Sequence, residues 1–212
     1  MTRYKLVEQI LRAVYGDQPR DDSTITPNLV NQYINQALAV GIKNQYKESI
    51  QIDGVAYVNN SFYTTYKELA ITQEQNLLWK VKLPLVPIAI GKNEGVANLR
   101  LVDPQGREGY DAIPMSMNQK GYHYEMRRIP NRLLYYYEGG NLFILSSLIL
   151  NTYKANITLI SGGGSGSGSS SDLNSELAAP DDFVAFIVEY VVKALMLARQ
   201  APKDNTNDGV SN

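Results

Sequence analysis

Apolar side chains recur along this chain with a helical period at both ends and an alternating period in between. Over residues 3–15 they are spaced three and four positions apart, which is the pattern of one helix face. Thr26–Pro27 supplies an N-cap and a first-turn proline for a second helix, whose apolar face continues to Ile42. A third helix is predicted over Pro180–Gln200, because it opens with a proline and two aspartates, which suit the positive end of a helix.

The first two predicted helices each have an apolar and a polar face. The polar face of the first consists of Arg3, Glu8, Gln9 and Arg12. The apolar face of the second consists of Val30, Tyr33, Ile34, Ala37, Leu38, Gly41 and Ile42, and its opposite face of Asn28, Asn31, Gln32, Asn35 and Gln36. Such an amide-rich face is usually solvated, but it also suits contacts between identical subunits, where charges would have to be desolvated.

In the middle of the chain the period changes from 3.6 to 2, which predicts strands. The expected strands are 49–52, 55–58, 78–87, 98–102, 132–137, 141–147 and 153–160. Asp53–Gly54 and Gly139–Gly140 are typical of tight hairpin turns, which need positive φ. The stretch from Pro104 to Arg132 contains too many glycines and prolines for one element, so we expect a long excursion from the sheet there.

These periods divide the chain into four parts. Residues 1–48 hold the N-terminal helices, 49–160 a β-rich insertion, 161–179 a flexible Gly/Ser loop, and 180–212 the last helix and a polar tail. The Gly/Ser tract is either a natural loop or an engineered linker, and the residues that follow it favour a natural loop. The expected fold class is α+β: one helical layer from both chain ends, with an antiparallel β domain inserted between them.

Composition removes several classes of function. The chain has 212 residues and a formal net charge of −1, so its overall charge gives no electrostatic attraction to nucleic acid. It has no cysteine, which excludes disulfides and thiolate chemistry. No signal peptide is expected, because the N-terminus enters an amphipathic pattern directly. Glu189 and Lys193 interrupt the last helix well short of the roughly 20 apolar residues a bilayer needs. We therefore expect a soluble protein without a membrane partner.

Candidate chemistry is sparse. His123 is the single histidine, and it has no recognisable acid or nucleophile beside it. The paired Asp181 and Asp182 are explained by helix capping, and the glycines of residues 91–95 and 106–109 by turns. The remaining carboxylates have neither calcium-loop nor zinc-site spacing. We predict no enzymatic activity, no catalytic residue, no cofactor and no metal site.

Two surface features are more suggestive. The 15 tyrosines concentrate around residues 62–66, 122–124 and 135–137, where they serve sheet packing, a protein interface, or a stacking platform for sugars or bases. A basic cluster consists of Lys120, Arg127, Arg128 and Arg132. It is either a solvated loop or a contact with DNA or an acidic partner.

The last helix is apolar on more than one side. Phe183, Ile187 and Val191 begin one stripe, other sides also carry apolar residues, and Glu189 with Lys193 forms the polar strip. Two short helices cover one side only, so the remaining surface predicts burial against a neighbouring subunit. The predicted subunit interface is Val30, Tyr33, Ile34, Phe183, Phe186, Ile187, Tyr190, Val191 and Leu195.

The order of these segments resembles the head-to-tail adaptor or ring proteins of tailed bacteriophages. The resemblance rests on the N-terminal helix pair, the β-rich insertion and the C-terminal helix opened by Ala179-Pro180-Asp181-Asp182-Phe183. Residues 134–145, Leu-Tyr-Tyr-Tyr-Glu-Gly-Gly-Asn-Leu-Phe-Ile-Leu, also resemble a hairpin that recurs there, as does Arg127–Pro130. Within this group the chain is most similar to ring proteins of crAss-like, short-tailed phages.

The resemblance implies a structural role at the portal vertex of a virion. Such proteins form closed, usually twelve-fold rings below the portal, between capsid and tail, around a channel through which DNA passes without sequence-specific binding. Neighbours contact through the helical layer, an adjacent tail or ring protein follows, and the C-terminal tail reaches the portal. The matching docking residues are Ala201, Pro202, Lys203, Asp204 and Asn207. The tyrosine clusters leave an alternative function, a carbohydrate- or cell-surface-binding β module.

Overall fold

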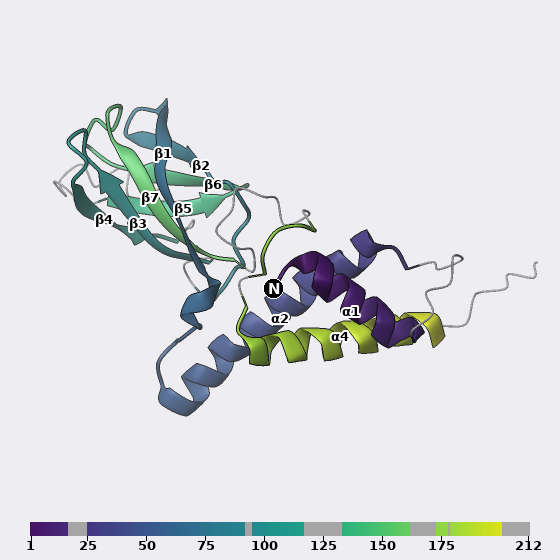
Figure 1. The fold of residues 1–212 in the computed structure, drawn as a ribbon. Helices are drawn as coiled ribbons and strands as arrows, with labels where there is room; N and C mark the ends of the chain where they lie inside the picture. The colour runs from purple at the N-terminus through teal and green to yellow at the C-terminus, as the bar shows by residue number, and fades with distance from the viewer. Residues whose placement is uncertain (17–24, 92–94, 117–132, 162–172, 178, 201–212) are drawn as a thin grey trace, which may run out of the picture.

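A computed structural model describes residues 1–16, 25–91, 95–116, 133–161, 173–177 and 179–200. Within this part, three helices form one layer and seven strands form a barrel beside it (Figure 1). The helices are α1 (Arg3–Tyr15), α2 (Pro27–Asp53) and α4 (Asp181–Gln200). The predicted α+β fold, with helices from both chain ends and the strands between them, is confirmed.

The ends of the helices largely follow the sequence signals. Gly16, with φ 72°, follows the last residue of α1. The side chain of Thr26 accepts a hydrogen bond from the Leu29 backbone N–H at 3.3 Å, as an N-cap should. Helix α4 begins one residue later than predicted, and the Pro180 carbonyl accepts hydrogen bonds from the amides of Phe183 and Val184.

The predicted hairpin at residues 49–58 is wrong. Helix α2 continues through this stretch to Asp53, and Gly54 ends it in the left-handed conformation (φ 68°), with its N–H donating to the Ile50 carbonyl at 3.1 Å. A glycine with positive φ serves a helix C-cap as well as a hairpin turn, and four alternating residues do not separate the two. The helical part of the chain therefore extends past residue 48.

The strands close into a barrel in the order β1-β2-β6-β5-β4-β3-β7. Their bounds are β1 Tyr63–Gln75, β2 Leu78–Lys82, β3 Val96–Val102, β4 Glu108–Pro114, β5 Leu133–Glu138, β6 Asn141–Leu145 and β7 Lys154–Ile160. Neighbouring strands are antiparallel except β4 and β5, which are parallel, so the prediction of an antiparallel domain is wrong for that pair. Strands β3, β5, β6 and β7 match predicted segments within two residues, and β2 is shorter than predicted. Strands β1 and β4 were not predicted, and β4 lies inside the stretch expected to leave the sheet.

Strand β1 pairs with two different strands along its length. Its first half pairs with β7 and its second half with β2, and the register with β7 shifts between Tyr66 and Leu69. Glu68 sits in this bulge with φ 56°, and its backbone N–H donates to the Asn156 side chain at 2.8 Å. The bulge bends one strand so that it serves both sides of the closed sheet.

The barrel and the helical layer are tied together at Phe62. This residue ends a 3₁₀ turn, Asn60–Phe62, that leads into β1, and its side chain is fully buried. Its ring packs edge-to-face on Phe183 of α4, with 4.8 Å between centroids. Its carbonyl accepts a hydrogen bond from the Ser161 N–H at 2.9 Å, just after β7. Residues at the end of the barrel nearest the helices, such as Phe62 and Ile160, therefore belong to the helical core.

Candidate assembly interface

Most of the predicted interface residues lie inside the chain's own helical core. Five are fully buried within one subunit: Val30, Ile34, Ile187, Val191 and Leu195. The other four, Tyr33, Phe183, Phe186 and Tyr190, are half-buried at the edge of that core. The interface remains a prediction, and only the half-buried four have surface left to offer a neighbour. On α4 the polar strip is an exposed ion pair between Glu189 and Lys193, as the spacing indicated.

Helices α2 and α4 approach closely because of a glycine. A Cβ at Gly41 would lie 2.4 Å from the Phe183 ring and 2.7 Å from the Phe186 ring, well inside ordinary contact. The missing side chain therefore makes room for two aromatic rings of α4. The sequence placed Gly41 on the apolar face without showing this function.

Arg3 is buried between α1 and α2, although the sequence pattern placed it on a polar face. Its side chain is 1% exposed, and its Nη1 donates to Asn31 Oδ1 at 2.9 Å and Asn35 Oδ1 at 2.7 Å. Burial lowers the pKa of Arg3, because desolvation disfavours its charged form. Part of the amide-rich face of α2 is thus used within the subunit.

The segment before α4 holds the beginning of α1. The amides of Arg3 and Tyr4 donate to the carbonyls of Ser175 and Leu173 at 3.0 and 2.8 Å, and the Leu177 amide donates to the Met1 carbonyl at 2.9 Å. These bonds satisfy N–H groups that a helix N-terminus leaves without partners. The two ends of the chain are therefore joined in one layer, as expected from the sequence.

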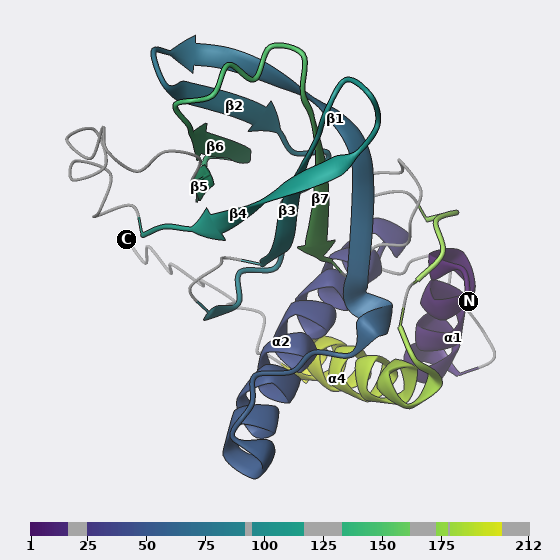
Figure 2. The same ribbon diagram turned by 90° about the vertical axis from the view of Figure 1, so that its left-hand side faces the viewer.

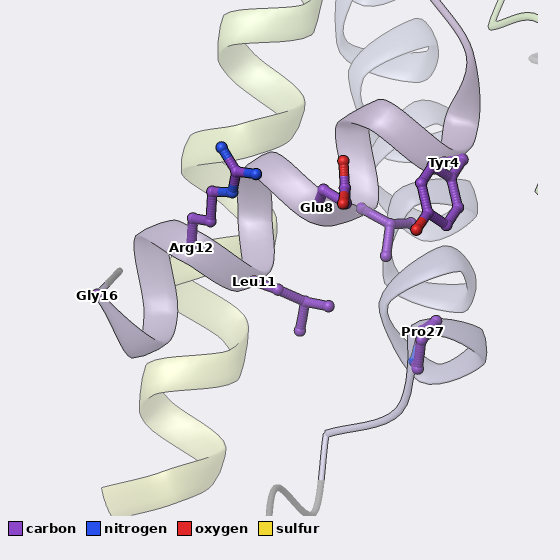
Figure 3. A pocket seen from close by; sticks show the side chains of 7 residues that line it. Tyr4, Glu8, Leu11, Arg12, Gly16 and Pro27 are labelled. Atoms are coloured by element: carbon purple, nitrogen blue, oxygen red, sulfur yellow. The ribbon is translucent and has the colours of Figure 1, made fainter. Parts of the chain in front are cut away.

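A groove runs along the outer side of α1. It has a volume of about 570 Å³ and is lined by Tyr4, Val7, Glu8, Leu11, Arg12, Gly16 and Pro27. Figure 3 shows the side chains of Tyr4, Glu8, Leu11 and Arg12 following one another along α1, with Pro27 at the start of α2 beside them. We call this feature the α1 groove. Nothing in the sequence pattern distinguished it from an ordinary helix surface.

The opposite end of α2 projects from the body of the subunit (Figures 1 and 2). Four large apolar side chains are exposed on it and on the turn that follows: Ile50, Ile52, Val55 and Tyr57. We call these four the α2 tip. Ser49 fixes the turn, because its Oγ accepts from the Tyr57 N–H at 2.9 Å. The single Ser49 hydroxyl proton has two acceptors within reach, the carbonyl oxygens of Tyr46 at 2.9 Å and Tyr57 at 3.1 Å. The tip is thus an ordered apolar surface.

The tyrosine run of β5 is used for packing. Tyr135 points into the barrel, where burial raises its pKa to about 12 because the charged form would be desolvated. Tyr136 lies on the outer side and stacks on Phe143, with 5.2 Å between ring centroids. Both faces of this hairpin are covered, as the alternation indicated.

The outer face of the barrel carries several charged pairs. Arg100 pairs with Asp111 at 2.8 Å and with Glu108 at 3.4 Å, and Lys154 pairs with Glu68 at 2.7 Å. All are exposed. Among the described residues, no three histidine, cysteine, aspartate or glutamate side chains group in a way that could hold a metal ion. None of the helices in this part of the chain has the length and apolarity to span a membrane.

Several predicted residues lie outside the described part of the chain. They are His123, the basic residues Lys120, Arg127, Arg128 and Arg132, and the tail residues Ala201, Pro202, Lys203, Asp204 and Asn207.

Comparison with known families decides the class of protein. A family model described as phage tail ring protein 2, CrAss_Ring_2, matches residues 5–210. The chain belongs to this family. The match covers nearly all of the chain and confirms the resemblance to crAss-like phage ring proteins. By the family's description, this ring protein is a structural component of a phage virion. No curated protein matches the chain.

Proposed function

We propose that this chain forms one ring of the head-to-tail connector, below the portal, and joins capsid and tail around the DNA channel. The observation that carries the proposal is the tail-ring family match over residues 5–210. The likeness of segment order to phage adaptors, two helices, a β insertion and a last helix, supports a place next to the portal.

The architecture suits a structural subunit that has to stay rigid. A ring protein must keep its shape while its neighbours bear on it, and here the barrel and the helices share one core through Phe62 and Phe183. A closed ring of identical subunits needs two different, complementary surfaces on each subunit. We propose twelve subunits, in line with the adaptors that the chain resembles.

The channel and the portal contact are parts of the same proposal. A net charge of −1 suits a wall along which DNA slides, because strong phosphate pairing would hold the DNA in place. We assign the tail residues Ala201 to Asn207 to portal docking. The basic cluster from Lys120 to Arg132 is proposed to contact DNA or an acidic partner. An adjacent tail or ring protein would complete the stack.

Co-purification with the portal protein tests this function. Mass measurement of the mixture should give a complex in which this chain and the portal subunit are present in equal numbers, and truncation after Gln200 should weaken it. A protein that stays monomeric with the portal present would contradict the proposal. The alternative, a glycan-binding module, gains no support from the β5 tyrosines, because Tyr135 and Tyr136 are buried.

A further inference from the structure

The α2 tip and the α1 groove lie at opposite ends of one helix. Pro27, at the first position of α2, lines the groove, whereas Ile50 and Ile52 lie in its last turn. Pro27 and Ile52 are 25 positions apart, and an α-helix rises 1.5 Å per residue, so the tip lies about 38 Å along α2 from the side of the groove that Pro27 forms. The apolar projection therefore lies at the C-terminal end of α2, and the recess lies mainly on α1, beside the N-terminal end of α2.

We propose that the α2 tip of one subunit inserts into the α1 groove of the next copy of the chain. This inference rests on the proposed ring and names the contact that would close it. A second copy is the occupant because the two surfaces are different, one projecting and one recessed, and both lie on the same chain. A repeating head-to-tail contact between identical subunits requires two different, complementary surfaces on each subunit.

One surface projects and the other is recessed, and both carry apolar side chains. Ile52 is 80% exposed, and Ile50, Val55 and Tyr57 are exposed with it at the end of the projecting helix and on the turn that follows. The groove has an apolar floor of Val7 and Leu11, with Tyr4 half-exposed at its rim. Its volume of about 570 Å³ lies within the range of pockets that enclose a whole small molecule, so it takes more than one side chain.

The charges of the two surfaces also match. Asp53 is the charged residue among residues 49–57, and Arg12 is the exposed cation on the groove rim. In the described part of the chain, neither side chain has an ion-pair partner within 4 Å. Insertion of the tip would bring Asp53 to the rim that carries Arg12. Glu8 also lines the groove, and Lys47, two turns before the end of α2, supplies a cation on the projecting helix.

The tip is held in one conformation before it binds. Gly54 caps the helix, and the bonds between Ser49 and the Tyr57 backbone close the turn. A surface that is already ordered loses little conformational entropy on association. An ordered interface accounts for four exposed apolar residues on the end of α2 and the turn that follows it.

The absence of cysteine from the chain allows a direct test by cross-linking. We would make three single-cysteine variants of the full chain: Ile52→Cys on the tip, Tyr4→Cys on the groove rim, and Ile149→Cys as a control. Ile149 is 75% exposed on the barrel, so it matches Ile52 in residue type and exposure. A short bismaleimide joins cysteines that come together, and an affinity tag on one variant identifies mixed products.

Mixing the Ile52→Cys and Tyr4→Cys variants should give covalent dimers with one copy of each. Either variant alone, or Ile149→Cys mixed with Tyr4→Cys, should give at least tenfold less dimer. A chain with both Ile52→Cys and Tyr4→Cys should give a ladder that ends at a closed species. Asp53→Arg on the tip variant should reduce the dimer yield at least tenfold, and Arg12→Asp on the groove variant should restore it.

The outcomes separate this contact from the proposed function. Dimers formed by Ile52→Cys alone would show that the tip binds another tip, and this would overturn the inference. Rings visible by electron microscopy without tip-to-groove cross-links would also overturn it, while the proposed ring would stand. Ladders that remain open chains even with the portal present would support the contact and contradict the closed ring. No cross-link above the Ile149 control, with or without portal, would reject the inference.

Discussion

Replacing Gly41 by alanine tests how closely α2 and α4 pack. The new Cβ would lie 2.4 Å from Phe183 Cζ and 2.7 Å from Phe186 Cε1, whereas carbon atoms pack best at about 3.5–4.0 Å. Both rings would have to move by about 1 Å. Phe183 also packs on Phe62, so its displacement disturbs the junction between helices and barrel.

The expected change is the balance of two opposing terms. Overpacking of this kind costs about 1–3 kcal/mol. Alanine in place of glycine inside a helix returns about 1 kcal/mol. Gly41→Ala should therefore lower the free energy of unfolding by about 1 kcal/mol, which corresponds to a fall in Tm of about 2–4 °C for a chain of this size. Ala39→Gly, on the same helix, is the control that measures the propensity term alone.

Urea unfolding followed by two signals would measure the effect. Circular dichroism at 222 nm reports the helices, and fluorescence of the single tryptophan, Trp79, reports the barrel. In a Phe183→Ala background the closest clash is gone, so Gly41→Ala should become about 1 kcal/mol less destabilising. A Gly41→Ala variant that is more stable than the parent by the full propensity term would refute the close approach.

Three further predictions follow from single contacts. Gly54→Ala forces a side chain into the left-handed conformation and should cost about 1 kcal/mol in urea unfolding, with faster amide exchange over residues 49–57. Arg3→Ala removes the buried donor to Asn31 and Asn35 and should cost about 2–4 kcal/mol, and Arg3→Lys should cost less; equal stability of Arg3→Ala and the parent would contradict the buried contact. The pKa of Tyr135 is raised from 10.0 to about 12, so the unfolded chain loses this proton first. Stability should therefore fall between pH 10 and pH 12, and less so in Tyr135→Phe, as measured by alkaline unfolding.

The helical layer was largely predictable because its signals are local. The spacing of apolar residues, the Thr26 cap and the Pro180 start each depend on neighbours within one or two turns. The end of α2 was missed because Gly54 has the same backbone requirement in a helix cap as in a hairpin. Burial of Arg3 was missed because its amide partners, Asn31 and Asn35, come from another helix.

The barrel was predictable only where its strands have an apolar face. Strands β3, β5, β6 and β7 alternate visibly because one side of each fills the interior. Strand β4 is exposed along nearly its whole length, and β1 has few buried positions, so neither shows a clear period of two. The parallel pairing of β4 with β5 depends on the closure of the whole sheet, which no local pattern encodes.

The candidate interface was also only partly predictable from the sequence. The sequence correctly indicated that the last helix is apolar on several sides, but it did not show how much of that surface the chain itself would cover. Val191 and Ile187 are fully buried within one subunit. The α1 groove combines residues from two helices, and the α2 tip depends on where α2 ends. Both therefore require the fold before they can be seen.

We propose that this chain forms a closed ring on the axis of a virion. An electron-microscope reconstruction of the portal vertex, in a virion that contains the protein, tests it most directly. We expect a ring of identical subunits below the portal, with the helical layers in contact and the DNA channel at the centre. Density for the chain on fibres or on the capsid surface, away from the axis, would contradict the account.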